Sequence, residues 1–445
     1  MEFLDNLVLP QSAEHIELLH YLQILVFFLL LPYLAILFGG TIVSLNYKRK
    51  FRKTGNGFYY RFAKDIIETV TINKSIGVIA GIIPLVTTIL IYTQLLHSSG
   101  SISIIYFFFA LLFDITALII IFTYRYSLIF NEIFESVEKL KTGDELAEEE
   151  FIQFRYGARA LSFKSGKYGL VFLALTVWFL IAGITSAIYY EQWADKGFFS
   201  QLLNLVVLTR FIYFILISLA LTGCTILFGF FFWEGGKKGI SEDYKQFIRE
   251  KSVRFTLISA IFLPVFILIN IFSIPSESLS GIVFGFGMIS LLLIFITYHF
   301  LYVLTSESYN RFSGLSFFFM LAVVLVLIVS DQQAMSNSTE LRSQVLSLEF
   351  EKHLAELKGE NTAAVINAEE IYQTRCAACH RFDVKLVGPP YNETLPKYEG
   401  KLNQLIAFIR NPVKVNPDYP PMPNPALKPN EAEAIAKYLL ETYKK

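Results

Sequence analysis

The sequence contains only three cysteines in 445 residues, and only 17% of its residues are charged. Cys376 and Cys379 are separated by two residues and Cys224 lies alone in an apolar segment, so a framework of disulfide bonds is excluded. We expect Cys224 to be a small buried apolar side chain. The basic residues lie beside apolar segments and form no separate basic domain, which argues against a nucleic-acid partner. So little charge is also atypical of a soluble protein of this length.

Apolar residues, by contrast, are abundant: they make up 54% of the chain, and phenylalanine alone occurs 43 times. They fall in about eight long blocks, each able to cross ~30 Å of hydrocarbon as a helix at ~1.5 Å per residue. The sequence therefore predicts an all-α polytopic bundle over residues 1–332. The blocks are 18–45, 76–96, 102–123, 170–189, 203–232, 255–272, 282–304 and 315–329.

The distribution of lysine and arginine predicts the orientation of this bundle. Clusters of basic residues follow the first, third and fifth blocks, whereas the segment before the first block and the connections at 98–101 and 275–281 have none. Because cytoplasmic connections carry the excess of Lys and Arg, both termini are expected outside the cytoplasm. We expect a multi-pass protein of the bacterial cytoplasmic (inner) membrane.

The sequence of residues 333–362 predicts an amphipathic helical connector. Asn337 is a candidate N-cap with Glu340 as its reciprocal partner, apolar residues recur at helical spacing over 341–357, and Gly359 is a candidate stop. The pattern fits a helix on the membrane surface, a helix packed on a partner, or a solvated spacer. Motion of the following domain would be permitted by a flexible stretch at 359–364.

One motif near the C-terminus carries chemistry: Cys376-Ala377-Ala378-Cys379-His380. This is the attachment sequence of a c-type haem, in which both thiols bond the porphyrin and the histidine binds the iron. A redox or zinc dithiol is the alternative, but zinc requires further ligands and His353 is the only nearby candidate.

Residues 363–445 as a whole resemble the small class I monohaem cytochromes c. The resemblance rests on Ala368–Tyr372 before the motif, Gly388-Pro389-Pro390 after it, Tyr419-Pro420-Pro421-Met422-Pro423, and a C-terminal helix starting near Pro429. It implies one covalent haem c in a small all-α domain, with His380 and Met422 as axial ligands and the carbonyl of Pro389 holding the His380 ring. It also implies an extracytoplasmic, periplasmic location, which agrees with the loop charges.

Two charged residues lie inside the apolar blocks, where a charge is costly. Asp114 falls in the middle of the third block and Arg210 near the outer end of the fifth. Either the two form a buried structural ion pair, or one of them lines a path for protons or quinone.

Three histidines, His15, His20 and His97, fall near the outer ends of the first two blocks. His15 and His20 differ by about 140° around a helix and cannot face one iron. A b-type haem would therefore use His97 with either His15 or His20; interfacial histidines without a ligand role are the alternative.

The bundle also resembles, faintly, the large subunit of cytochrome bd quinol oxidases. The resemblance lies in Lys74–Gly81, in 178–193 and in Phe198–Leu203. The fifth block, however, has Arg210-Phe211-Ile212-Tyr213 where that family places a haem-ligating histidine, and the link 275–281 is too short for its quinol-binding loop.

These features of the sequence predict one of two alternative functions. The first is a membrane-anchored cytochrome c subunit of a respiratory complex, with other membrane subunits, a soluble or membrane redox partner, and lipid or quinone as partners. The second is a quinol-oxidising or terminal-oxidase subunit with additional b haem. The scarcity of histidine and methionine inside the blocks favours the first, a non-catalytic electron-transfer role.

Overall fold

A computed structural model of the chain describes residues 10–97, 99–137, 145–306, 310–358, 367–417 and 419–444. Every regular element in these ranges is a helix, which confirms the predicted all-α class. The chain divides into two compact units, and each is described by itself. One, the membrane bundle, comprises Leu22–Tyr92 and Ser101–Asn337; the other comprises Met1–Tyr21, Thr93–Gly100 and Ser338–Lys445.

Helices α2 to α13 supply the predicted spans. Their bounds are α2 (Ala13–Thr54), α3 (Gly57–Thr71), α4 (Lys74–Gly77), η1 (Val78–Ile82), α5 (Ile83–Leu95), α6 (Ser103–Val137), α7 (Glu145–Ile188), α8 (Phe198–Leu202), α9 (Leu205–Phe231), η2 (Trp233–Gly235), α10 (Glu242–Ala260), α11 (Leu263–Ser273), α12 (Gly281–Ser306) and α13 (Asn310–Ser338). Eight helical stretches of the described residues are long and apolar enough to cross a membrane. The second span joins α4, η1 and α5, and the sixth joins α10 and α11.

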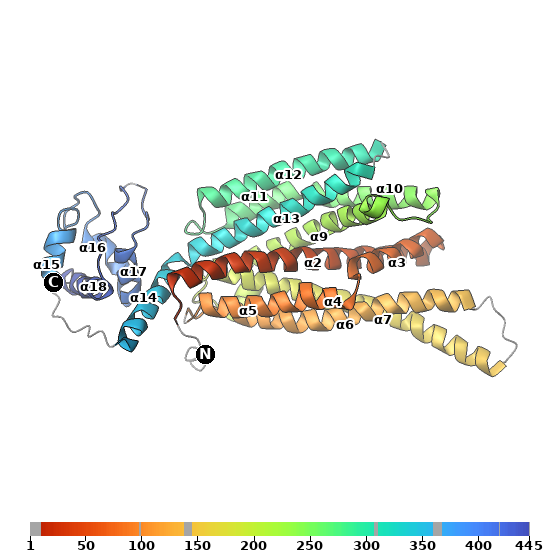
Figure 1. Ribbon diagram of the computed structural model, residues 1–445, viewed down its shortest axis with the longest axis horizontal. Coiled ribbons are helices and arrows are strands. Elements are labelled where there is room, and N and C mark those ends of the chain that lie inside the picture. The colour runs from red at the N-terminus through yellow and green to blue at the C-terminus, as the bar shows by residue number, and fades with distance from the viewer. Residues whose placement is uncertain are drawn as a thin grey trace. The chain divides into compact units, whose positions relative to one another are not determined.

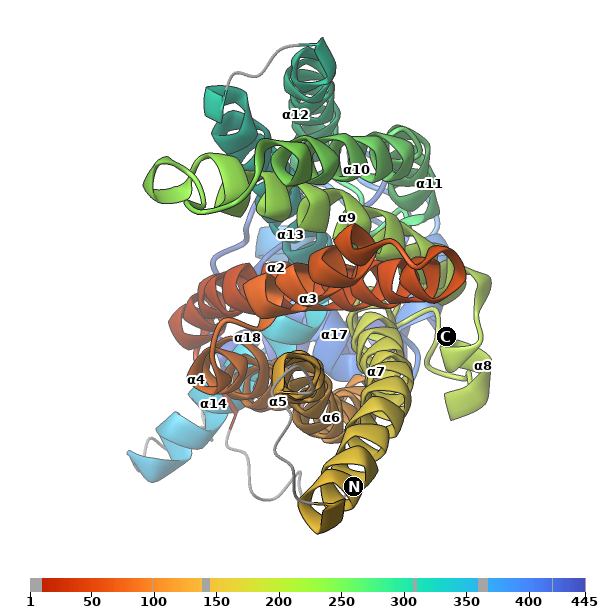
Figure 2. The same ribbon diagram turned by 90° about the vertical axis from the view of Figure 1, so that its right-hand side faces the viewer.

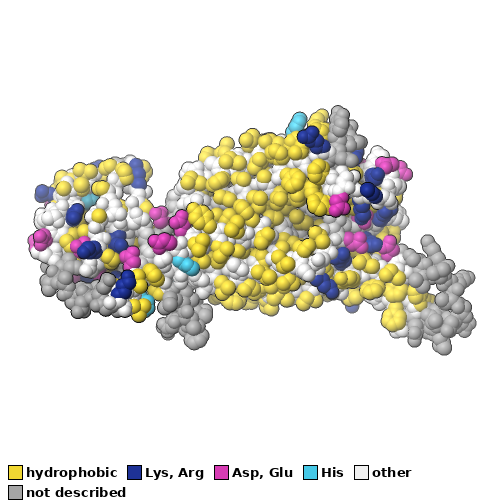
Figure 3. Space-filling model, in the orientation of Figure 1, with side chains coloured by type: hydrophobic (Ala, Val, Ile, Leu, Met, Phe, Trp, Pro, Cys, Tyr) yellow, Lys and Arg dark blue, Asp and Glu magenta, His cyan; other side chains and the backbone are white. Residues whose placement is uncertain are grey.

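The bundle has an apolar flank and a charged end. Figure 3 shows hydrophobic side chains over its length and basic side chains gathered at one end. The C-terminal ends of α2, α6, α9 and α12 all lie at that end (Figure 1). Alternating connections therefore meet at opposite ends, as a chain that repeatedly crosses a membrane requires, and the predicted multi-pass architecture is confirmed.

Small residues let the helices approach closely, as is typical of packing within membranes. A methyl group placed on Gly39 of α2 would lie 2.4 Å from the backbone oxygen of Ser218 in α9. One placed on Gly183 of α7 would lie 2.6 Å from the ring of Phe107 in α6. Figure 2 shows the resulting arrangement, with α2 and α9 neighbours and α6 beside α7. Cys224 of α9 is fully buried, as expected of a small apolar side chain.

The predicted cap at Asn337 is wrong. Asn337 lies inside α13, and its side-chain amide donates to the carbonyl of Ser278, at 2.9 Å, while accepting from Gln333. These tertiary bonds satisfy the side chain, so α13 continues past the apolar block to Ser338. The connector helix begins two residues later than a cap at Asn337 implies, as α14 (Glu340–Leu357).

Helix α14 packs on the C-terminal domain. Val345 and Leu348 are buried in the same apolar core as residues of α17 (Leu402–Arg410) and α18 (Pro429–Thr442). Two ion pairs of 2.8 Å flank this contact, Glu351 with Arg410 and Lys352 with Glu433. Helix α14 therefore packs on the C-terminal domain of its own chain, whereas the alternatives expected from the sequence were the membrane surface, a partner or solvent. The candidate stop and flexible stretch at 359–364 lie outside the described residues, and the limits 1–332, 333–362 and 363–445 stay predictions.

We predict that Gly39→Ala destabilises the bundle. The added methyl group meets the backbone of α9, which cannot rotate away, and overpacking of this kind costs about 1–3 kcal/mol. Gly285→Ala is the matched control, because a methyl group at this position of α12 meets no atom within 4 Å. Thermal unfolding of the purified chain in detergent measures the difference. Equal melting temperatures for the two variants would contradict the close contact of α2 and α9.

Candidate haem-binding site

The residues of the predicted attachment motif follow a short distorted helix. Asn367 caps α15 (Ala368–Ile371) by accepting a hydrogen bond from the backbone nitrogen of Glu370, at 3.2 Å. The helix then widens into the π-turn η3 (Tyr372–Cys376), a distortion that is frequent at functional sites. The chain turns at once, because the backbone nitrogens of Cys379 and His380 both donate to the carbonyl of Cys376, at 3.0 and 2.9 Å. The turn holds two thiols and one imidazole within five residues.

A single backbone carbonyl fixes the imidazole of His380. Nδ1 of His380 lies 3.0 Å from the carbonyl oxygen of Pro389, and because that oxygen only accepts, Nδ1 carries the proton. Nε2 is then the nitrogen with a free lone pair, as a metal ligand requires. Gly388 makes room for the ring, since a methyl group there would lie 2.2 Å from Cε1. The ring of Tyr391 stacks on the imidazole, at 5.0 Å between centroids and 16° between planes.

Around His380 lies a cavity of about 520 Å³. Cys376, His380 and Met422 all line it, so one attachment cysteine and both predicted axial residues share one space; Cys379 is not among its lining residues. The remaining wall is mainly apolar and aromatic. It includes Leu395 and Tyr398, which precede α17, Leu405, Phe408 and Ile409 of α17, Leu439 of α18, and Tyr419. This chemistry fits a haem: a flat apolar macrocycle, two thiols for covalent attachment, and nitrogen and sulfur donors for its iron.

The two cysteines of the motif differ in environment. Cys376 is buried and Cys379 is half-buried, and neither forms a disulfide. Burial raises the pKa of the Cys376 thiol, with a smaller contribution from the nearby Cys379, while a hydrogen bond with Tyr391 acts in the opposite direction. No group of three or more His, Cys, Asp or Glu able to hold a bare metal ion occurs among the residues that the structure describes.

In the bundle, the postulated ion pair between Asp114 and Arg210 is wrong. Arg210 of α9 instead lies 3.4 Å from Asp331 of α13. Asp114 lies against η1, where a methyl group on Gly81 would be 3.1 Å from Oδ2 of Asp114. Both its carboxylate oxygens are buried and have no hydrogen-bond partner among the described residues. Asp331, two residues past the eighth predicted block, was missed because hydropathy ends the block at 329; a charge just beyond such a block is the available signal.

Of the three histidines proposed for a b-type haem, His15 forms a hydrogen bond through its imidazole: its Nε2 lies 3.0 Å from Oε1 of Gln94. The backbone carbonyl of His97 accepts a hydrogen bond from Arg342. His20 is half-buried, and its Nδ1 has no hydrogen-bond partner among the described residues. Nothing in the described residues supports a b-type haem, and its ligation by these histidines stays a prediction.

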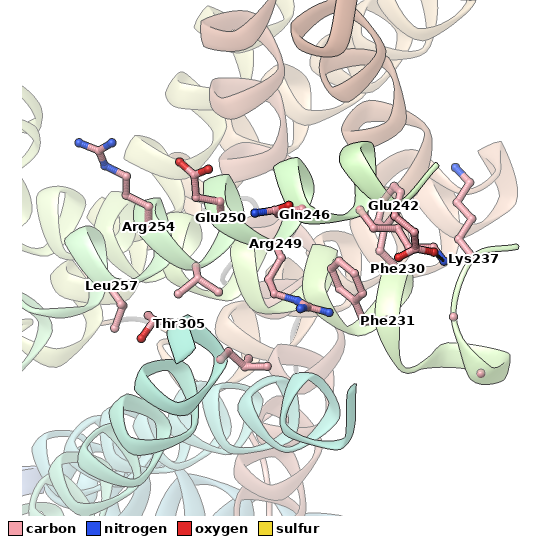
Figure 4. A pocket seen from close by; sticks show the side chains of 15 residues that line it. Phe230, Phe231, Lys237, Glu242, Gln246, Arg249, Glu250, Arg254, Leu257 and Thr305 are labelled. Carbon is pink, nitrogen blue, oxygen red and sulfur yellow. Dashed lines mark hydrogen bonds and ion pairs between the residues drawn. The ribbon is translucent and has the colours of Figure 1, made fainter. Parts of the chain in front are cut away.

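A larger cavity, of about 920 Å³, lies between η2, α10 and the end of α12 (Figure 4). Its walls carry Lys237, Lys245, Arg249 and Arg254 together with Glu242 and Glu250. Lys245 pairs with Glu242 at 2.7 Å, and the guanidinium of Arg249 lies over the ring of Phe231, at 4.9 Å. This charged cleft belongs to the basic end of the bundle and contains no Cys, His or Met, so it is not a redox site of the kind formed around His380.

The comparisons with known proteins match the C-terminal domain. The Cytochrome c family matches residues 365–442. Cytochrome c-551 of Pseudomonas denitrificans is 36% identical over 77 residues, which are 16% of this chain and 93% of that protein. Cytochrome c-551 of Azotobacter vinelandii is 37% identical over 76 residues, again 16% of this chain and 93% of the relative. No solved structure matches significantly.

These matches agree with the local geometry. They cover the attachment motif, the carbonyl of Pro389 and the loop of Met422, and the family they identify carries a covalent haem c and transfers electrons. The resemblance predicted for the C-terminal residues is therefore confirmed, and through this domain the chain belongs to the cytochrome c family.

Proposed function

We propose that this protein is a membrane-anchored cytochrome c subunit of a respiratory electron-transfer complex. The observation that carries the proposal is the hydrogen bond between Nδ1 of His380 and the carbonyl of Pro389, in a cavity that Met422 also lines. It supports His380 Nε2 and the sulfur of Met422 as the two axial ligands of one haem c. When bound, the haem supplies one-electron chemistry at its iron.

The residues of this chain then hold, orient and shield the haem. Cys376 and Cys379 attach it, the carbonyl of Pro389 keeps His380 in one tautomer and orientation, and Tyr391 limits rotation of the imidazole. Apolar side chains from α17 and α18 keep water from the haem. With histidine and methionine both bound, no coordination position stays open for oxygen, and the potential is raised. The site is suited to relaying electrons.

Exposed apolar side chains give this domain a surface for a redox partner. Val384, Leu386 and Val387, which precede Gly388, are exposed, as is Val415 at the cavity wall. Small, partly apolar contacts of this kind are typical of transient electron-transfer complexes. The bundle likewise presents large apolar side chains along its spans, and we propose lipid and other membrane subunits as their partners.

The proposed location is the bacterial cytoplasmic membrane, with both termini and the haem domain on the periplasmic side. Support comes from the basic connections gathered at one end of the bundle, because an even number of spans leaves both termini on the side opposite them.

The alternative function, a quinol-oxidising or terminal-oxidase subunit, differs in requiring b haem. We predict that the purified, reduced chain has the absorption bands of a c-type haem alone, with one haem per chain. Quantitative haem analysis together with the reduced-minus-oxidised spectrum tests this. Additional b or d bands would support the alternative.

We predict that Cys376→Ala and Cys379→Ala each weaken or abolish covalent haem attachment, because each removes one thioether bond. Cys224→Ala is the matched control, since Cys224 is buried among apolar residues of α9 and lies outside the motif. Haem-stained denaturing gels of the membrane fraction measure retention. Full haem retention in both motif variants would contradict the assignment.

Replacing Met422 by leucine is expected to lower the reduction potential while haem stays attached. Leucine has a similar volume but no sulfur, so the iron loses the ligand that stabilises its reduced state. The expected decrease is on the order of 0.1 V, well within the ≈0.8 V range that axial ligands control. Potentiometric titration measures it, with Met288→Leu on the exposed face of α12 as control. An unchanged potential would rule out Met422 as a ligand.

A further inference from the structure

The bundle contains a second, mainly apolar cavity of about 90 Å³ that the haem site does not use. Figures 1 and 2 show α2, α9 and α13 as neighbours within the bundle, and these helices, with α7 and α11, line the cavity. Its apolar walls include Phe27, Leu31, Phe214, Leu327 and Ile328. All its lining residues belong to the membrane bundle.

Five polar side chains from three helices converge on this apolar space: Arg210, Tyr213, Asn270, Asp331 and Gln332. Arg210 is only 6% exposed and lies 3.4 Å from Asp331, and Gln332 is 2% exposed. Four polar atoms of the cluster are buried without a hydrogen-bond partner in the described residues. They are Nε of Arg210, the hydroxyl of Tyr213, Oδ1 of Asn270 and Oε1 of Gln332.

Burying such a cluster within a membrane lowers the stability of the folded protein. A buried polar atom without a partner costs about 1–3 kcal/mol, and phenylalanine at position 213 would avoid this cost with nearly the same shape. Folding alone therefore does not account for the cluster. Polar groups that converge on an apolar cavity are typical of a ligand site, although this cavity is smaller than the ~300–1,000 Å³ of a complete site. It therefore has room for one ring edge of a ligand, and the rest of the molecule would lie outside it.

From this geometry we infer that the cavity binds the head group of a membrane quinone or quinol. The apolar walls suit a flat ring, and the unpartnered groups include both donors and acceptors. Nε of Arg210 donates, Oδ1 of Asn270 and Oε1 of Gln332 accept, and the hydroxyl of Tyr213 does either. A quinone carbonyl needs donors and a quinol hydroxyl needs acceptors, so a mixed set accommodates both forms of the carrier.

The position of the cavity along the chain fits a carrier of electrons for the haem domain. Arg210 lies near the start of α9, Asn270 near the end of α11 and Asp331 near the end of α13. These three helix ends share one side of the bundle, opposite its charged end. The choice of a redox carrier over another flat apolar molecule rests on the proposed electron-transfer function.

Calorimetric titration of the full-length, haem-loaded chain tests the inference. The chain is placed in nanodiscs of synthetic, quinone-free phosphatidylcholine and titrated with decylubiquinone and, separately, with menadione; nanodiscs without protein are subtracted. Saturable binding of at least one probe, near one per chain, is expected. Absence of saturable binding of both would overturn the inference, because water alone would then fill the cavity.

The substitution Tyr213→Phe tests whether the probe binds in this cavity. The substitution removes one oxygen that has no protein partner, so the stability of the quinone-free chain is expected to stay the same or rise. The Kd of the bound probe is expected to rise about fivefold, which corresponds to one lost hydrogen bond. Tyr302→Phe is the matched control, because Tyr302 of α12 is 70% exposed and lies outside the cavity.

An unchanged Kd in Tyr213→Phe would overturn the assignment to this cavity. Asp331→Asn provides an independent second variant, which keeps the shape of the side chain and removes its charge; it too is expected to weaken binding. Failure of this inference is distinguishable from failure of the proposed function. Covalent haem and its redox titration are measured on the same samples, and their loss, not that of quinone binding, would contradict the haem assignment.

Discussion

The hydrogen bond from Nδ1 of His380 to the carbonyl of Pro389 decides what the C-terminal domain can do. A free imidazole exchanges its proton between two nitrogens and rotates about its side-chain bonds, whereas this contact fixes both the tautomer and the ring plane. Much of the local structure serves this contact. Gly388 leaves space that a methyl group would fill, Tyr391 stacks on the ring, and the backbone of Gly388 is held by a 2.9 Å bond to the carbonyl of Cys379. The motif and the proline segment therefore work as one folded element.

The bundle obeys a different constraint, the cost of polar groups in hydrocarbon. Backbone groups are satisfied within helices, and close packing is achieved where glycines such as Gly39 face a neighbouring backbone. Asp114 and the cluster around Arg210 are exceptions, because they carry charge and unpartnered polar atoms at positions where apolar residues would cost less free energy to bury. Asp114 lies alone beside Gly81, whereas the cluster around Arg210 has a cavity, a counter-charge and several donors and acceptors. This difference is why the cluster, and not Asp114, is assigned a ligand.

Sequence reasoning was sufficient where the signal is local. The eight spans follow from runs of apolar residues, and the haem motif follows from the spacing of Cys376, Cys379 and His380. It was insufficient for pairings between distant segments. Arg210 was matched with Asp114, the charge visible inside a block, although its neighbour in space is Asp331, 121 residues along the chain. Likewise Asn337 has the chemistry of a cap, but a carbonyl 59 residues away engages its side chain and lets α13 continue. Neither periodicity nor propensity contains that information.

The attachment of α14 to the haem domain bears on how the two halves of the chain cooperate. Had α14 been a solvated spacer, its apolar stripe would have faced water, and the domain that follows would have had no fixed contact with the chain leaving the bundle. Instead Val345 and Leu348 are buried with α17 and α18, and Glu351 and Lys352 are paired with residues of the domain. Burial of the two apolar side chains contributes on the order of 1.5–3 kcal/mol each, more than the exposed ion pairs provide. The helix that follows the last span is thus part of the haem domain's own core, and any swing of the domain must carry α14 with it.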